Sequence, residues 1–300
     1  MRALVQHAPG PPAEVVELVE MPTPEPGPGQ ILCRVLAAPI APTDLLAIRG
    51  HYPVGMPHGA PLGMQGIGYD ERGVRWLLPM RAGSWASHVV VNPAEALRLP
   101  DYLSPVQSCG ARINPCTALM LLEGCEGPVI VDPASSGVGQ HILQIALARG
   151  LDVACVIRRP ERRARLEELG ATCIVEHPKE LEPRFALAID AAGGRRTARL
   201  ARALAPGGRL VSIGATTRES PTLGIGDLVF RGIRVEGFWL LRENRLRPDY
   251  GADVLDQAIE LLRKGTLHTE TAAVYELEDW RDALAMAQSP ERCGQVVLTP

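Results

Sequence analysis

The central part of the chain alternates two hydrophobic patterns. Between residues 127 and 265, short apolar runs alternate with segments in which apolar residues recur at helical spacing. The runs predict strands at 127–133, 151–157, 172–175, 185–192, 209–214 and 233–241, and the periodic segments predict helices at 139–150, 160–170, 195–208 and 253–265. Alternating strands and helices are typical of a parallel sheet with helices on both faces.

The two ends of the chain share a different pattern. Apolar stretches at 30–40 and 85–91 are separated by turns rich in proline and glycine, and residues 272–300 return to short strands around one helix, 278–288. We therefore predict an α/β protein in which a doubly wound parallel Rossmann domain, 116–267, is inserted into a smaller, mainly β domain. That smaller domain combines 1–115 with 268–300.

Composition narrows the class of protein. Of the 300 residues, 46% are hydrophobic and 22% charged, which is typical of a globular chain. A net charge of −3 and only 4% aromatic residues favour neither a nucleic-acid partner nor an anionic membrane surface. No apolar run approaches the ~20 residues of a membrane span, and the start, MRALVQHAPGPP, lacks the apolar core of a signal peptide. We expect a cytoplasmic protein.

Cysteine and histidine spacing gives no metal signature. The seven cysteines form an odd, scattered set without a CxxC pair: positions 33, 109, 116, 125, 155, 173 and 293. The seven histidines are dispersed and contain no HExxH motif. Reduced, mostly buried thiols are expected.

A small-residue turn follows the strand predicted at 127–133. The segment ASSGVG, 134–139, precedes a helix, and this is where a dinucleotide fold binds phosphate. Small residues let the backbone approach a pyrophosphate, and the N-terminus of the helix attracts it. Ala134 and Ser136 replace the first two glycines of the strict GxGxxG pattern, and an ordinary strand-to-helix turn is the alternative.

The end of the next predicted strand indicates which dinucleotide binds. An NAD site places an acidic residue about 20 residues after the glycines, where it binds the ribose hydroxyls. Here Arg158 and Arg159 follow Gly137 by 21 and 22 residues, and 157–160 contains no acid. Guanidinium groups pair well with a 2′-phosphate, so the expected cofactor is NADPH. In a chain with 29 arginines, the alternative is two more surface residues.

The chain resembles the medium-chain dehydrogenase/reductase superfamily. The likeness is greatest to its zinc-free NADPH-dependent trans-2-enoyl-thioester reductases and quinone oxidoreductases. The residues that carry it are INPCTA at 113–118, SSGVGQ at 135–140, RPE at 159–161, GA at 214–215 and GFWL at 237–240. The resemblance runs nearly end to end and implies a Rossmann domain within a GroES-like catalytic domain.

The zinc positions of that superfamily are not kept. Zinc members resembling this chain carry Cys-His-Thr-Asp where it has Ala41-Pro42-Thr43-Asp44, and Gly-His-Glu where it has Gly63-Met64-Gln65. Alanine and methionine are not zinc ligands of that kind. We expect no metal.

The resemblance also implies the chemistry and its residues. Without zinc, the easier reaction is hydride transfer to an alkene activated by a carbonyl, followed by protonation of the α-carbon. In the enoyl reductases the proton donor is a tyrosine in a Gly-x-Tyr setting, which corresponds here to Gly50-His51-Tyr52. A loop tyrosine that packs on its neighbours is the alternative for Tyr52.

The cofactor contacts that the resemblance implies are spread over five segments. Asn114 is expected on the nicotinamide side, with 135–138 at the pyrophosphate and Arg158 and Arg159 at the 2′-phosphate. The loop after the strand predicted at 209–214, together with 238–240, is expected to line the nicotinamide pocket. The full set is Asn114, Ser135, Ser136, Gly137, Val138, Arg158, Arg159, Ile213, Gly214, Ala215, Thr216, Phe238, Trp239 and Leu240.

The catalytic domain departs from the resemblance at 68–76. Roughly two dozen residues of a longer excursion are absent there, so we expect a reshaped substrate cleft. The favoured function is NADPH-dependent reduction of a 2-enoyl thioester or small enone. A quinone oxidoreductase and an NADPH-binding protein without turnover remain alternatives. The resemblance and the apolar strand at 233–241 favour a homodimer, because a bare apolar edge strand is costly.

Overall fold

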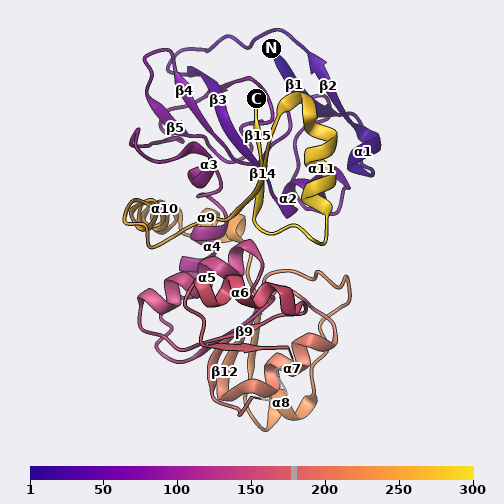
Figure 1. The fold of residues 1–300 in the computed structure, drawn as a ribbon, viewed down its shortest axis with the longest axis vertical. Coiled ribbons are helices and arrows are strands. Elements are labelled where there is room, and N and C mark those ends of the chain that lie inside the picture. Colours follow the sequence, from indigo (N-terminus) through magenta and orange to yellow (C-terminus); the bar gives the residue numbers. More distant parts are fainter. Residues whose placement is uncertain (177–180) are drawn as a thin grey trace. The chain divides into compact units, whose positions relative to one another are not determined.

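The structure, a computed structural model, describes residues 1–176 and 181–300 as two compact units (Figure 1). Unit 1 is Met1–Arg112 with His268–Pro300, and unit 2 is Ile113–Leu267. Unit 2 begins three residues before the expected position 116. The reason is that helix α4 (Asn114–Leu121) starts there and packs on α5 (Gly137–Ala148) and α10 (Pro248–Arg263) of the same unit.

Unit 2 contains a six-stranded sheet in which every neighbouring pair is parallel. The strands, in sheet order, are β10 (Cys173–Val175), β9 (Val153–Val156), β8 (Val129–Asp132), β11 (Phe185–Asp190), β12 (Leu204–Ser212) and β13 (Arg234–Gly237). The chain runs outward from β8 through β9 to β10 and then returns to β11 on the other side of β8. The strand order therefore reverses between β8 and β11, and ligands of such sheets bind at the carboxyl ends of the strands near that point.

Helices cover both faces of this sheet. Alternate residues of β8 point to opposite sides, so Val129 and Val131 join one apolar core while Ile130 joins the other. The first core includes α4, α5 and α10, and the second includes α7 (Arg195–Ala203). Among the residues that the structure describes, the unit has four shorter helices: η1 (Pro160–Arg162), α6 (Arg163–Glu168), α8 (Ile225–Val229) and α9 (Leu240–Leu246).

Two predicted elements end four or five residues earlier than the sequence pattern indicated. The helix predicted at 195–208 stops at Ala203, because buried Leu204 begins β12 as the register partner of Phe185. The strand predicted at 233–241 stops at Gly237. Its apolar continuation leaves the sheet, and Trp239 becomes the N-cap of α9. Apolar composition alone does not distinguish a strand from a buried helix start.

Unit 1 is built from both ends of the chain (Figure 1). Its larger sheet has the order β14 (Thr271–Glu276), β15 (Gln295–Thr299), β3 (Ile31–Ile40), β4 (Ile67–Asp70), β5 (Arg75–Leu77) and β7 (Leu97–Arg98), with β6 (His88–Val91) also on β3. β15 runs antiparallel to β3, with Val297 opposite Pro39. The last segment of the chain therefore completes the sheet begun by the first.

The smaller elements of unit 1 close its core. A two-stranded sheet joins β1 (Arg2–Gln6) and β2 (Val16–Glu20). The helices are α1 (Pro12–Val15), α2 (Pro42–Ile48), α3 (Pro105–Ser108), η3 (Leu277–Asp279) and α11 (Trp280–Gln288). Fully buried Trp85 and almost fully buried Trp280 belong to one apolar cluster, in which the Trp85 indole also donates to the Pro39 carbonyl at 3.2 Å.

The shortened region 68–76 is a tight hairpin between β4 and β5. The Asp70 carboxylate accepts the backbone N–H groups of Arg72 and Val74, both at 2.9 Å, and the Trp76 indole N–H at 3.1 Å. Burial acts to raise the pKa of Asp70, but these donors outweigh it and hold the pKa below its ordinary value. One side chain therefore organises this turn.

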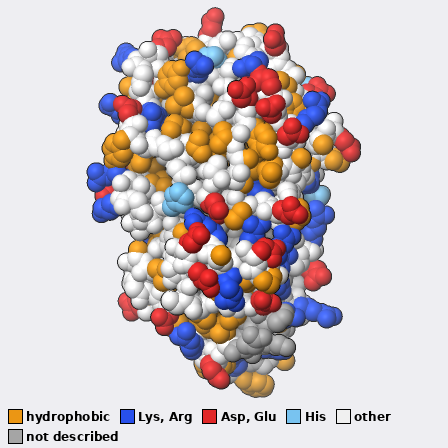
Figure 2. Space-filling model, viewed as in Figure 1, with side chains coloured by type: hydrophobic (Ala, Val, Ile, Leu, Met, Phe, Trp, Pro, Cys, Tyr) orange, Lys and Arg blue, Asp and Glu red, His pale blue; other side chains and the backbone are white. Residues whose placement is uncertain are grey.

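Within the described residues, no helix combines the length and apolarity needed to cross a membrane. On the face drawn in Figure 2, basic and acidic side chains are interspersed.

Candidate cofactor-binding site

The turn between β8 and α5 is closed by its own small residues. Ser136 caps α5: its hydroxyl accepts the Gly139 N–H at 3.1 Å and donates to the Pro133 carbonyl at 2.9 Å. A Cβ on Gly139 would stand 2.6 Å from the carbonyl oxygens of both Pro133 and Ala134. Only glycine fits there, so the helix can start close against the end of the strand. The N-terminal N–H groups of α5 then lie at the carboxyl edge of the sheet.

Asn114 lies against this turn. A Cβ on Gly137 would stand 2.8 Å from Asn114 Nδ2, so the side-chain amide of Asn114, at the start of α4, is next to exposed Gly137. The resemblance implies a place on the nicotinamide side for Asn114, and the structure places its amide beside the turn at 134–139.

The two arginines follow β9, the strand beside β8. The Ala134 N–H donates to the Val156 carbonyl at 3.0 Å, which ties the turn to the end of β9. Ile157 is still buried, Arg158 is exposed and Arg159 is half-buried. Arg158 and Arg159 therefore leave the sheet where a cofactor on the turn would place its adenosine ribose.

The loop 213–216 continues β12 at the same edge. The Ile213 N–H donates to the Asp190 carbonyl at 2.8 Å, and the Thr216 N–H donates to the Ala191 carbonyl at 3.0 Å. Ile213 is half-buried, while Gly214, Ala215 and Thr216 are exposed. The loop is thus fastened to the end of β11 and presents its backbone outward.

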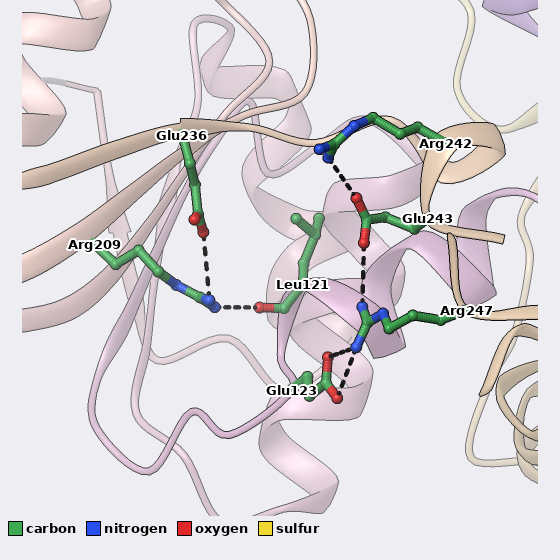
Figure 3. Close-up of polar contacts among 7 residues, drawn as sticks. All are labelled: Leu121, Glu123, Arg209, Glu236, Arg242, Glu243 and Arg247. Atoms are coloured by element: carbon green, nitrogen blue, oxygen red, sulfur yellow. Dashed lines mark hydrogen bonds and ion pairs between the residues drawn. The ribbon is translucent and has the colours of Figure 1, made fainter. Parts of the chain in front are cut away.

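Segment 238–240 lies beyond the neighbouring strand β13. The Phe238 N–H donates to the Ser212 carbonyl at 2.9 Å, and Leu240 is buried. Helix α9 starts here and is anchored by ion pairs of Arg247, drawn in Figure 3. Arg247 meets Glu243 at 3.3 Å and Glu123 at 2.9 Å. These ion pairs therefore link the end of α9 to Glu123, which follows α4.

Arginine also caps the carboxyl end of α4. Arg209 Nη2 donates to the Leu121 carbonyl at 3.1 Å, and its Nη1 lies 3.4 Å from a Glu236 carboxylate oxygen (Figure 3). Arg149 Nη1 donates to the Leu122 carbonyl at 2.8 Å. Cations satisfy the last carbonyls of a helix and stabilise its negative end. This fixes the helix whose first residue is Asn114.

All predicted cofactor residues except Asn114 thus follow the carboxyl ends of β8, β9, β12 and β13, which lie at one edge of one parallel sheet. The set combines a helix N-terminus, a glycine that no larger residue can replace, and two guanidinium groups. These donors suit a ligand with a pyrophosphate and a further phosphate.

Sequence reasoning missed two charged residues at this edge. Asp132, the last residue of β8, is buried and forms two hydrogen bonds with Arg196 of α7, at 2.8 and 2.5 Å. A charged residue at the end of an otherwise apolar run was a signal for Asp132. No signal singled out Arg196 among 29 arginines.

Tyr52 lies in unit 1, on the loop after α2. The loop follows Gly50, whose φ is +73°, and the His51 N–H donates to the Leu46 carbonyl at 2.8 Å. Tyr52 is half-buried. Farther along the loop, Arg81 Nη2 donates to the Gly55 carbonyl at 2.7 Å. A side chain from a different loop therefore holds the Tyr52 loop.

Two further arginines of unit 1, Arg112 and Arg49, also have partners within that unit. Arg112 donates to the carbonyls of Leu77, at 3.2 Å, and Glu95, at 2.8 Å. Arg49 donates to the Gln288 side chain.

A buried carboxylate joins the two segments that carry zinc ligands in the zinc enzymes. Asp44 Oδ2 accepts the Ala41 N–H at 2.8 Å, and Oδ1 accepts the Met64 N–H at 2.9 Å. Burial raises the pKa of Asp44 to about 7. Over residues 1–176 and 181–300, no group of three or more His, Cys, Asp or Glu side chains could hold a metal ion.

Comparison with known proteins finds both sequence and structural relatives. A family model described as zinc-binding dehydrogenase matches residues 137–264. The mitochondrial enoyl-[acyl-carrier-protein] reductase of Bos taurus is 30% identical, over 100% of this chain and 88% of that protein.

Two solved structures share the fold. The complex of Etr1p with NADP and crotonyl-CoA superimposes with a TM-score of 0.88 at 21% identity, covering 100% of this chain and 99% of that one. Etr1p is a mitochondrial 2-enoyl thioester reductase of Candida tropicalis. A mycobacterial quinone oxidoreductase gives a TM-score of 0.87 at 20% identity, with 100% of both chains covered.

Proposed function

Because this chain belongs to the medium-chain dehydrogenase/reductase superfamily, among the enoyl-thioester and quinone reductases, we propose that it reduces an activated carbon–carbon double bond with NADPH. One observation carries the proposal: the turn after β8, where a Cβ on Gly139 would clash with the backbone, lies beside β9, the strand that Arg158 and Arg159 follow. That edge fits a phosphorylated dinucleotide.

In this proposal each part of the edge binds one part of the cofactor. The start of α5 and the backbone of 135–138 bind the pyrophosphate, with Asn114 beside them. Arg158 and Arg159 bind the 2′-phosphate, since guanidinium groups form charge-assisted hydrogen bonds with it. The loop 213–216 and segment 238–240 line the nicotinamide pocket.

Tyr52 is the proposed proton donor. NADPH, when bound, supplies the hydride that adds to the β-carbon of the alkene, and the conjugated carbonyl takes up the electron pair. The Tyr52 hydroxyl then gives its proton to the α-carbon and recovers one from water. One hydride and one proton saturate the double bond. The hydrogen bond from Arg81 to the Gly55 carbonyl, three residues after Tyr52, supports a positioned donor.

The substrate class that we favour is a 2-enoyl thioester or a small enone. Bovine enoyl-[acyl-carrier-protein] reductase, which aligns along this whole chain, acts on a thioester by its name. A quinone is the second candidate, because the β4–β5 hairpin replaces a longer excursion with a tight turn and a compact substrate needs less protein around it.

A substrate panel tests this function. NADPH oxidation is followed at fixed enzyme with crotonyl-CoA, a longer 2-enoyl-CoA, a small enone and a benzoquinone. Turnover of the thioesters or the enone above the quinone supports the proposal. Turnover of the quinone alone selects the oxidoreductase alternative. NADPH binding without turnover of any substrate selects a binding protein.

We also propose that the protein is a homodimer that associates through β13. This strand is the last in its sheet among the described residues, and all four of its residues are exposed. Nearby in sequence, Phe230 is 87% exposed and Ile225 and Val229 are exposed as well. An edge strand with apolar neighbours is stabilised by pairing with a second copy. A monomeric mass at micromolar concentration in light scattering would contradict this.

The remaining proposals concern metal and location. Alanine at 41 and methionine at 64 favour an enzyme without zinc, and metal analysis of the dialysed protein tests it: stoichiometric zinc would overturn it. We also propose a cytoplasmic location. The sequence relatives are named mitochondrial, so fractionation of the source cells decides between the two.

A further inference from the structure

A buried ion pair lies at the edge where the cofactor is proposed to bind. Asp132 ends β8, directly before the phosphate turn, and its side chain is completely buried. Arg196 Nε lies 2.8 Å from Asp132 Oδ2, and Arg196 Nη2 lies 2.5 Å from Oδ1. The Arg196 side chain is 16% exposed, and its guanidinium donates two parallel hydrogen bonds to the Asp132 carboxylate.

A second carboxylate stands beside the first. Asp190 ends β11 and is the register partner of Asp132. Its oxygens accept the N–H groups of Ala192 and Gly193, at 2.8 and 2.9 Å, and the Thr197 hydroxyl, at 2.6 Å. Asp190 thus has neutral donors of its own, and Arg196 is the cation that pairs with Asp132.

Arg158 also acts on this carboxylate. Burial raises the pKa of the Asp132 carboxyl above its ordinary value and Asp190 adds to that, while Arg196 and, more weakly, Arg158 favour the charged form. Arg158 comes two residues after Val156, the last residue of β9, and Asp132 is the last residue of the neighbouring strand β8. The two charged residues therefore follow adjacent strand ends, within electrostatic range of each other. If Arg196 were absent, the buried carboxylate would attract Arg158 and repel any anion bound at the turn.

We propose that Arg196 is a specificity-determining residue for NADPH: by neutralising Asp132 it leaves the charge of Arg158 to the 2′-phosphate. This inference rests on the proposed NADPH site. The effect falls mainly on the cofactor with the 2′-phosphate, because that group brings about two more negative charges to the arginines. NADH lacks the group and depends less on the pair.

Dissociation constants of NADPH and NADH, measured by calorimetry without substrate, test the inference. Arg196→Gln is expected to weaken NADPH binding at least tenfold more than NADH binding. Asp132→Asn combined with Arg196→Gln removes both charges and is expected to restore the wild-type ratio to within about threefold. Arg202→Gln removes one positive charge from an exposed position of the same helix and is expected to leave the ratio unchanged.

Thermal unfolding of each variant accompanies these measurements. Arg196→Lys keeps the positive charge but cannot form the two parallel hydrogen bonds. It is expected to preserve the ratio of NADH to NADPH dissociation constants even where it lowers the melting temperature. Equal loss of NADPH and NADH affinity in Arg196→Gln would overturn the inference and leave a structural ion pair. A loss of NADPH preference in Arg196→Lys as large as that in Arg196→Gln would also overturn the inference. A wild-type protein without preference for NADPH would instead refute the proposed cofactor, and the two failures are thus distinguishable.

Discussion

Nη2 of Arg81 lies 2.7 Å from the carbonyl oxygen of Gly55, three residues after Tyr52. Arg81 is one of two non-glycine residues with positive φ among those described, at +65°, and its own N–H donates to the Met64 carbonyl at 2.8 Å. A left-handed arginine costs about 1–2 kcal/mol relative to the ordinary conformation. The side chain contact that accompanies this strained backbone fastens the loop of the proposed proton donor.

Replacing Arg81 separates the effect of the strained backbone from that of the side-chain contact. Arg81→Gly relieves the backbone and removes the fastening, so we expect a melting temperature equal to or above that of the wild type, with a severalfold lower kcat. Arg81→Ala also removes the fastening but keeps the strained φ, and is expected to show the lower kcat together with a lower melting temperature. Unchanged kcat in both variants would mean that the contact does not position Tyr52.

Tyr52→Phe tests the proton donor itself. Phenylalanine keeps the ring and removes only the hydroxyl, so turnover on an enone or enoyl thioester is expected to fall ~10²–10⁴-fold while NADPH affinity stays nearly constant. Protonation by water would then also change deuterium placement at the α-carbon of the product. A mutant with wild-type rate and stereochemistry would return Tyr52 to a packing role.

Cofactor preference is expected to depend on the arginines after β9. A pair of charge-assisted contacts corresponds to roughly tenfold to hundredfold tighter binding of NADPH than of NADH. Arg158→Ala and Arg159→Ala should each reduce this ratio, chiefly by weakening NADPH binding. Arg202→Ala, which removes an arginine from an exposed position of α7, is the matched control. Equal affinities in the wild type would contradict the prediction.

Gly139→Ala tests the close start of α5. Its Cβ would stand 2.6 Å from two backbone carbonyl oxygens, so the helix must move away from β8. We expect destabilisation of about 1–3 kcal/mol, as for other overpacked sites, and weaker binding of both NADPH and NADH. Gly226→Ala adds the same methyl group in α8, where its nearest neighbour is the Phe230 ring at 3.8 Å, and should change neither property. Normal cofactor affinity in Gly139→Ala would show that the turn does not contact the cofactor.

Asp44 is expected to make stability depend on pH. Its pKa is about 7 in the folded protein and about 3.9 in an unfolded chain. Between these values the folded state holds a proton that the unfolded state has released, so this group makes stability fall as pH rises from about 4 to about 7, by at most ~1.4 kcal/mol per pH unit. Above the folded pKa the penalty is constant.

Asp44→Asn removes this titration. The amide cannot accept both N–H groups, so the variant starts less stable at low pH. Its deficit relative to the wild type is expected to shrink as pH rises through this interval, measured by denaturant unfolding at several pH values. A deficit that does not change with pH would show that Asp44 is ionised throughout.

The sequence by itself determined the features that depend on residues close together along the chain. The strand–turn–helix at 127–150 follows from an apolar run, small residues and a helical repeat within one short segment. The tandem Arg158 and Arg159 could be located because the turn and the following strand fix their place along the chain. The two styles of hydrophobic pattern separated the middle of the chain from its ends for the same reason.

Only the tertiary structure decided the pairings that cross the sheet. Asp132 and Arg196 are 64 residues apart and meet because β11 returns beside β8, so that the helix after β11 starts where β8 ends. The same cause ends α7 at Ala203, since pairing of Leu204 with Phe185 outweighs the helical pattern that continues past it. Asp44 likewise meets Met64, 20 residues farther along the chain, after the rest of α2 and a loop whose path no local pattern encodes. A hydrophobic pattern specifies which face of a helix or strand is buried. The order of the strands decides which side chains that face packs against.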